Sequence, residues 1–291
     1  MHRCAAAAFL NHKGGVGKTT SVANVGAGLA ILGKRVLVVD LDSQGHLTSF
    51  LGVGRSEIGR TIYDVLRGDV HPRDAVITRA LKARFHIDGR ETQLSMAVIP
   101  ATLDFADAEE SLANVKNRAF LLRNAIAKIA DGYDHILLDC SPSLGLISIN
   151  ALVAARRVFI PVQTEYLALH SLEDLMTRIE SVMDQLNPDL EIGGLIATRF
   201  DARKVLSRTV VETLRERFGS LFLNTVIRDN IVLAESPQFG KDIFSYRPRS
   251  FGAEDYLNLS MEIMNRVTRA SLFPSVETGA TPSTESSPIA V

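Results

Sequence analysis

The sequence predicts a single α/β domain in which helices cover both faces of a doubly wound, mostly parallel sheet. Apolar runs with the composition of strands alternate along the chain with stretches whose apolar residues recur at helical spacing. A glycine-rich loop joins the first apolar run to the first helical stretch, and two later apolar runs end in aspartate. This alternation is typical of a parallel sheet, which binds ligands at the carboxyl ends of its strands.

Composition limits the classes of function. The 291 residues include 32 basic and 33 acidic side chains, for a net charge of −1, so any binding to nucleic acid must come from a local patch. The two cysteines, Cys4 and Cys140, are too few for a disulfide framework and suit a reducing compartment. No apolar run approaches the ~18 residues of a membrane span. We therefore expect a soluble, cytoplasmic protein that does not bind membranes.

The glycine-rich loop predicts a phosphate site. Residues 5–10 form the apolar run and residues 18–32 the helical stretch, so the glycines between them let backbone N–H groups point inward at the positive end of a helix. Lys18 would reach the β- and γ-phosphates, and the Thr19 hydroxyl would bind Mg²⁺. The predicted nucleotide contacts in the loop are Gly14, Gly15, Val16, Gly17, Lys18, Thr19 and Thr20.

A second lysine makes the motif more specific. His12 stands where the general phosphate-loop pattern has glycine, and Lys13 opens the string Lys-Gly-Gly-Val-Gly-Lys-Thr-Thr. This string resembles the deviant Walker A motif of the ParA/MinD family of P-loop NTPases. The resemblance implies that Lys13 crosses a dimer interface to the nucleotide of the partner subunit. We therefore expect a homodimer in the ATP state, with Lys13 and Lys18 both catalytic.

Aspartates follow two predicted strands. The run at residues 36–39 leads into Asp40 and Asp42, in a segment that resembles the switch I box of the same family. That resemblance implies that Asp42 orients the attacking water and that Asp40 supports the Mg²⁺ shell. The run at residues 135–138 ends in Asp139, the form of a Walker B element, which would hold Mg²⁺ through water. ATP and Mg²⁺ are the predicted ligands.

Periodicity predicts most of the remaining elements. Strands are expected at residues 96–99, 158–165 and 191–198, and helices near residue 63 and at residues 105–130, 150–155, 171–186, 207–218 and 256–273. Residues 79–93 are expected to form a surface excursion. Residues 274–291 are rich in Ser, Thr and Pro, so we predict a disordered tail that follows an ATPase domain at residues 1–273.

A basic stretch predicts the DNA contacts. Residues 225–241 resemble the closing motif of the same family, where Asn230 takes the place of the adenine contact. The resemblance also implies binding of non-specific DNA, and residues 199–249 hold ten basic and six acidic side chains. Two arginines of the family motif are Asp229 and Val232 here, so either the patch is shifted by about a residue or the affinity for DNA is weak, and we expect the shifted patch. The predicted contacts are Arg199, Arg203, Lys204, Arg208, Arg228, Arg247 and Arg249.

The resemblance implies a slow, nucleoid-associated ATPase that segregates chromosome or plasmid DNA. ATP would form the dimer, the dimer would bind DNA, and a ParB-like partner would stimulate hydrolysis and release. A relative that positions a protein cargo, such as a carboxysome or chemoreceptor cluster, through a cargo adaptor has the same ATPase motifs. A MinD-like membrane regulator would need a basic amphipathic helix at its end, but residues 274–291 lack Lys and Arg. A metabolic phosphate-loop ligase would leave Lys13 unexplained, and an iron–sulfur reductase would need more cysteines.

Overall fold

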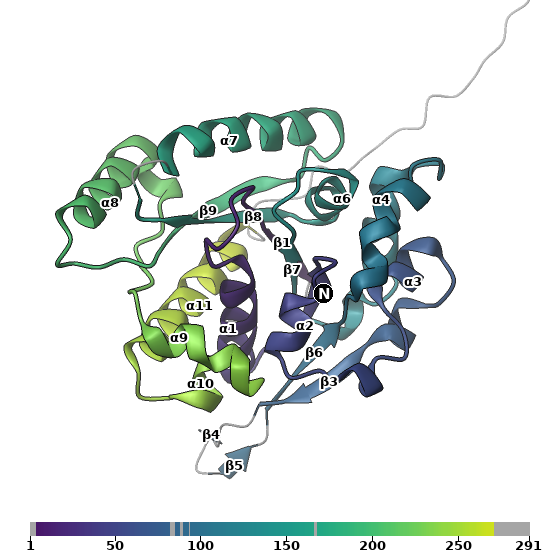
Figure 1. The fold of residues 1–291 in the computed structure, drawn as a ribbon, viewed down its shortest axis with the longest axis horizontal. Coiled ribbons are helices and arrows are strands. Elements are labelled where there is room, and N and C mark those ends of the chain that lie inside the picture. The colour runs from purple at the N-terminus through teal and green to yellow at the C-terminus, as the bar shows by residue number, and fades with distance from the viewer. Residues whose placement is uncertain (1–3, 82–84, 88–89, 93, 166–167, 271–291) are drawn as a thin grey trace, which may run out of the picture.

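The computed structural model describes residues 4–81, 85–87, 90–92, 94–165 and 168–270. Within these ranges, seven strands form one sheet in the order β3-β6-β2-β7-β1-β8-β9 (Figure 1). All neighbours pair in parallel except β3 and β6. The strands are β1 (Ala5–Phe9), β2 (Val36–Leu41), β3 (Ile77–Ala80), β6 (Ser95–Ile99), β7 (His135–Cys140), β8 (Arg157–Gln163) and β9 (Glu191–Thr198), and a separate hairpin pairs β4 (Phe85–Ile87) with β5 (Arg90–Thr92).

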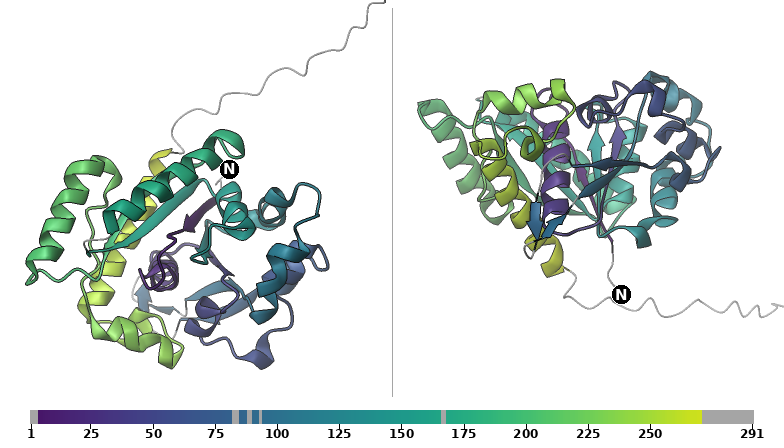
Figure 2. Two further views of the ribbon diagram at one scale, coloured as in Figure 1. Left: turned by 45° about the horizontal axis from the view of Figure 1, so that its top comes forward. Right: turned by 90° about the horizontal axis from the view of Figure 1, so that it is seen from below.

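Helices cover both faces of this sheet, as the sequence predicts (Figures 1 and 2). Successive residues of β1 point to opposite faces, so Ala7 and Phe9 belong to one apolar core and Ala6 and Ala8 to the other. The first core contains α1 (Lys18–Ile31), α2 (His46–Phe50), α9 (Ile231–Glu235), α10 (Ile243–Tyr246) and α11 (Phe251–Ala270). The second contains α3 (Ile62–Arg67), α4 (Ala108–Ser111), α5 (Leu121–Ala127), α6 (Leu146–Ala154), α7 (Ala168–Gln185) and α8 (Val205–Phe218).

Two sequence predictions differ from the structure. The single helix predicted at residues 105–130 is wrong, because a turn with Asn117 at φ 57° separates α4 from α5 and leaves Val115 39% exposed. The stretch at residues 79–93 begins inside β3, and parts of it lie outside the described residues. The predicted tail also lies outside them. None of the helices that the structure describes is long and apolar enough to cross a membrane.

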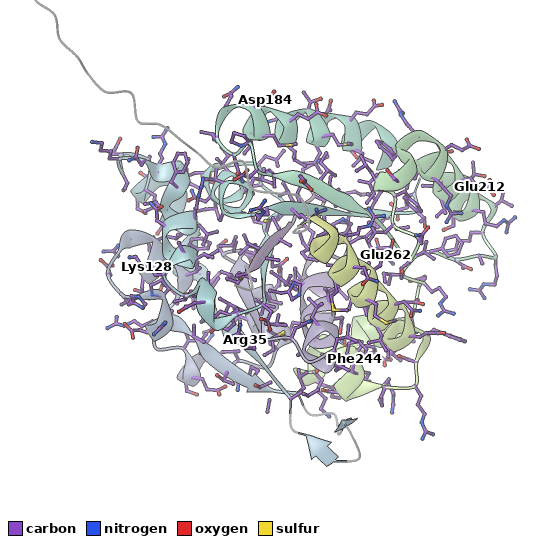
Figure 3. All side chains as sticks on the ribbon, turned by 180° about the vertical axis from the view of Figure 1, so that it is seen from behind. Arg35, Lys128, Asp184, Glu212, Phe244 and Glu262 are labelled. Carbon is purple, nitrogen blue, oxygen red and sulfur yellow. The ribbon has the colours of Figure 1, made fainter. Side chains whose placement is uncertain are left out.

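The C-terminal helices are anchored to α1, the helix that follows the glycine-rich loop. The Asn24 side chain on α1 accepts a hydrogen bond of 2.7 Å from the backbone N–H of Ile243. A Cβ atom at Gly28 would lie 2.2 Å from Ser260 Oγ on α11, so this close helix contact requires glycine. Figure 3 shows Phe244 from behind, near the helices that this contact joins. Residues more than 200 positions apart in the chain thereby hold the helix that carries the loop.

Candidate nucleotide site

The glycine-rich loop lies between β1 and α1, at the carboxyl end of the central strands. Gly15 has φ +75° and Gly17 has φ +91°, a backbone region that favours glycine. Gly17 is the N-cap of α1, so the loop leads directly into the positive end of a 14-residue helix. A Cβ atom at Gly14 or Gly15 would meet nothing within 4 Å, so this side of the loop is open to a ligand.

Polar side chains at the ends of two other strands donate hydrogen bonds to carbonyl groups of the loop, which therefore point into the protein. Gln163 Nε2, at the end of β8, donates to the Gly15 carbonyl at 2.9 Å, and Thr198 Oγ1, at the end of β9, donates to the Val16 carbonyl at 2.9 Å. Asn11 bridges the Pro161 carbonyl and the Lys13 amide at 2.7 and 3.0 Å. Because these contacts engage the carbonyls, the loop can present its amides to an anion. The sequence analysis missed this bracing, although a polar residue ending a buried strand was a signal for it.

The two lysines of the motif have different surroundings. Lys18 is 7% exposed and its Nζ donates to the Lys13 carbonyl at 3.2 Å. Burial lowers the pKa of Lys18, while the nearby Asp139, Cys140 and Asp42 act in the opposite direction. Lys13 is more exposed and forms an ion pair of 2.9 Å with Glu165. Lys18 therefore belongs to the interior of the site, whereas Lys13 lies on its outer surface.

The two strand-end aspartates lie side by side. Asp40 of β2 and Asp139 of β7 are register partners and both side chains are 0% exposed. Asp40 accepts three hydrogen bonds, one from the Asp42 amide at 3.1 Å and two from Thr48 at 2.8 and 2.7 Å. Burial raises the pKa of Asp40 to about 6, although the Thr48 hydrogen bonds lower it.

Asp139 is the better candidate for a cation contact. Among the residues that the structure describes, neither of its carboxylate oxygens has a hydrogen-bond partner. Burial raises the pKa of Asp139 well above its ordinary value and the charge of Asp40 raises it further, while the nearby Thr19 hydroxyl and Lys18 oppose the change. Two buried, unpartnered carboxylate oxygens next to a threonine hydroxyl fit Mg²⁺, which binds oxygen ligands and keeps part of its water shell.

Asp42 and Asn230 lie at the ends of secondary-structure elements. Asp42 directly follows β2, is 14% exposed and accepts a hydrogen bond from the Gln44 amide at 3.0 Å. Its charge is close enough to affect both Lys18 and Asp139. Asn230 is the N-cap of α9, and its Oδ1 accepts from the Val232 amide at 3.2 Å. The predicted adenine contact thus has a local structural role as well.

The predicted DNA contacts form a band from the start of α8 to the start of α11. Arg203 and Lys204 pair with Asp201, and Arg199 pairs with Asp229 at 3.8 Å. A backbone bridge between Phe200 and Arg228 places Arg228 next to the segment that carries Arg199.

Arg228 is the most strongly engaged cation in this band. It pairs with Asp255 at 2.5 Å and with Glu254 at 2.7 Å, and its guanidinium lies 4.3 Å from the centre of the Phe251 ring. The hydrogen bonds that Arg228 donates to Asp255 raise the pKa of Arg228 above its ordinary range. Arg208, Arg247 and Arg249 have no ion-pair partner among the described residues. The charge available to DNA is therefore smaller than the sequence count indicates.

Comparisons with known proteins identify relatives that match most of the chain. A family model described as an AAA domain matches residues 5–192. The sporulation initiation inhibitor protein Soj of Bacillus subtilis is 42% identical over 256 residues, which cover 88% of this chain and 96% of Soj. The chromosome partitioning protein ParA of Caulobacter vibrioides is 40% identical over 261 residues, which cover 89% of this chain and 93% of ParA.

A solved structure is also similar. It is cobyrinic acid a,c-diamide synthase from Mycobacterium smegmatis with bound ADP and magnesium, with a TM-score of 0.77 and 32% sequence identity. The match covers 94% of this chain and 99% of that one.

Proposed function

We propose that this chain, which belongs to the Soj and ParA family of chromosome-partitioning ATPases, segregates DNA and that dimerisation controls its ATP hydrolysis. The chain is an ATPase that uses ATP and Mg²⁺. In the proposed cycle, ATP joins two copies into a homodimer, the dimer binds non-specific DNA, and a ParB-like protein stimulates hydrolysis and releases it. The cycle would take place in the cytoplasm, on the nucleoid.

One observation supports the hydrolytic site above all others. The unpartnered Asp139 carboxylate lies at the end of β7, close to Lys18 and to the Thr19 hydroxyl at the start of α1. Asp139 and Thr19 would hold Mg²⁺, which neutralises phosphate charge when bound. Lys18 and the loop amides would stabilise the charge that develops on the transferred phosphoryl group, and Asp42 would hold a water in line with it.

The proposed dimer depends on Lys13. Its ammonium lies on the outer surface of the loop, and its ion-pair partner Glu165 is 56% exposed. Exposed ion pairs are weak, so the Lys13 side chain can leave Glu165 at little cost when a second subunit docks. In the partner's site, Lys13 would add a positive charge next to the phosphates and so link hydrolysis to dimerisation.

The proposed DNA surface is the band from α8 to α11. We expect direct phosphate contacts from Arg208, Arg247 and Arg249, because none of these arginines forms an ion pair with a carboxylate of the described residues. Asp229 and Val232, which replace two arginines of the family motif, reduce the charge near α9. Arg247 and Arg249 follow α10 and offset this loss on the neighbouring segment.

A metabolic ligase is a second candidate, because the solved structure from Mycobacterium smegmatis bears the name of a diamide synthase. Its identity of 32% is below the 40–42% of the partition proteins. The exposed Lys13 fits a dimeric ATPase better than a ligase. Rapid ATP turnover that depends on a small carboxylic acid and an amine donor would favour the ligase.

The decisive experiment measures binding of the purified protein to random-sequence DNA with ATP, with ADP and without nucleotide, at two salt concentrations. We expect salt-sensitive binding with ATP alone, because phosphate contacts weaken steeply as salt rises. Absence of DNA binding in every nucleotide state would contradict the partition role. Binding that ATP does not change would contradict the proposed cycle.

A further inference from the structure

Thr48, on the short helix α2, joins three segments of the nucleotide site. Its side chain is 4% exposed. The Thr48 hydroxyl donates to Asp40 Oδ2 at 2.7 Å, and its backbone N–H donates to the same oxygen at 2.8 Å. The hydroxyl also accepts a hydrogen bond of 3.1 Å from the Ala101 amide, just beyond β6. One hydroxyl therefore uses both its donor and an acceptor position in a buried network.

This arrangement is not ordinary helix capping. Gly45 is the N-cap of α2 and makes no side-chain cap. A threonine inside a helix commonly donates to the carbonyl four residues earlier. Thr48 instead donates to a carboxylate eight residues earlier, on a strand of the central sheet. The hydroxyl thus serves a contact between separate elements rather than the helix itself.

A second close contact fixes the same segment. Gly45 has φ +63°, and a Cβ atom there would lie 3.0 Å from the Ala101 carbonyl oxygen. The Gly45 amide donates to the Asp42 carbonyl at 2.9 Å. The Asp42 amide in turn donates to Asp40 Oδ1 at 3.1 Å. The backbone of Asp42 is consequently held at both its amide and its carbonyl.

We propose that Thr48 is a positioning residue for ATP hydrolysis, which anchors Asp40 and the following turn so that Asp42 is held at the phosphate site. This inference rests on the catalytic role of Asp42 in the proposed function. A carboxylate has about four lone-pair positions, and three hydrogen bonds occupy most of those of Asp40. Asp40 therefore acts chiefly as an anchor, and Asp139 is the aspartate available to the metal.

The test compares Thr48→Val, which keeps the shape and removes the hydroxyl, with Thr48→Ser, which keeps the hydroxyl. In the full-length protein with saturating ATP and Mg²⁺, we expect Thr48→Val to slow hydrolysis about tenfold, the effect of losing a hydrogen bond to a charged group. ATP affinity should change by less than about twofold, because Thr48 does not line the loop. Thr48→Ser should recover at least about a third of the wild-type rate.

Hydrogen exchange provides a readout that does not depend on turnover. In nucleotide-free protein, the Asp42 and Ala101 amides should exchange about tenfold faster in Thr48→Val and near the wild-type rate in Thr48→Ser. Thr48→Ala serves as a second variant without the hydroxyl if valine prevents folding, and the melting temperature of each variant shows that it is folded.

Three results would overturn the inference. The first is an unchanged hydrolysis rate in folded Thr48→Val. The second is a loss of ATP affinity in Thr48→Val that is as large as its loss of rate. The third is a Thr48→Ser variant that hydrolyses ATP as slowly as Thr48→Val. A wild-type protein that does not hydrolyse ATP would overturn the proposed function together with the inference. A wild-type protein that hydrolyses ATP with an unaffected Thr48→Val variant would overturn only the role of Thr48.

Discussion

Replacing Asp139 with alanine is expected to stabilise the nucleotide-free protein and to abolish the magnesium-dependent part of its stabilisation by ATP. The Asp139 side chain is 0% exposed, and both of its oxygens lack a hydrogen-bond partner in the described part of the chain. Burial, followed by the charge of Asp40, raises its pKa well above the ordinary value. Because the folded state holds this proton more tightly than the unfolded state, ionisation of Asp139 lowers folding stability as pH rises above the unfolded-state pKa.

The expected magnitude follows from two opposing effects. An unsatisfied buried polar group costs about 1–3 kcal/mol, more when it is charged, and the small cavity left by truncation offsets roughly 1 kcal/mol of the gain. The net stabilisation of about 0–2 kcal/mol should raise the melting temperature by up to roughly 6 °C at pH 7. In the wild type, ligand at about 100 times its dissociation constant adds about 2.7 kcal/mol, and the magnesium-dependent part of this should disappear in the variant.

Thermal unfolding at pH 7 measures both effects, with no ligand, with Mg²⁺ and ATP, and with ATP plus a chelator. Cys140→Ala is a matched control, because Cys140 is the next buried residue on β7 and packs in the apolar core. That control should lose stability and keep the magnesium response. An Asp139→Ala protein that melts below the wild type and still responds to Mg²⁺ would refute the assignment of Asp139 to the cation.

Three further predictions concern catalysis, the dimer and DNA. Asp42→Ala should form the ATP dimer without releasing phosphate, as size-exclusion chromatography and a phosphate assay would show; a monomer in ATP would contradict this role. Lys13→Ala should lose the ATP dimer. Glu165→Gln should tighten the dimer by no more than about thirtyfold in analytical ultracentrifugation, because each exposed ion pair contributes at most about 1 kcal/mol and dimerisation breaks two of them. Arg249→Ala should reduce the salt slope of DNA binding by about 1, and Arg203→Ala, whose cation is paired with Asp201, by less. If DNA binding has the same salt slope in the wild type, Arg249→Ala and Arg203→Ala, Arg249 does not belong to the DNA surface.

The sequence predicted the central strands and the position of the phosphate loop because these signals are local. The apolar run at residues 5–10, the glycines and the helix at residues 18–32 are neighbours in the chain, and the structure has β1, the loop and α1 there. The bracing of the loop could not be predicted in the same way. Gln163 reaches the loop from 148 positions away and Thr198 from 182 positions away, and no local pattern specifies which carbonyl they meet.

The two largest differences also have physical causes. Apolar residues continue at helical spacing from residue 105 to residue 130 because α4 and α5 pack against the same core, so periodicity alone did not reveal the turn at Asn117. The basic stretch gave the number of cations but not their partners. Asp255 and Glu254, which pair with Arg228, lie outside the counted range of residues 199–249. Charge counts therefore overestimate a binding surface when carboxylates from another helix pair with it.

Asp40 and Asp139 show how far a strand-end pattern can define a role. Each directly follows buried apolar residues on neighbouring parallel strands, so the pattern placed both at one edge of the sheet. Their roles separate only because α2 returns over β2 and directs Thr48 at one of them. Three hydrogen bonds stabilise the ionised form of Asp40. Asp139 accepts no hydrogen bond of ordinary length in the described structure, and only the nearby Thr19 hydroxyl and the charge of Lys18 favour its ionised form. A cation that enters the site should therefore gain most from Asp139, whose buried charge is the less satisfied of the two, and Asp40 is left to hold Asp42 in place.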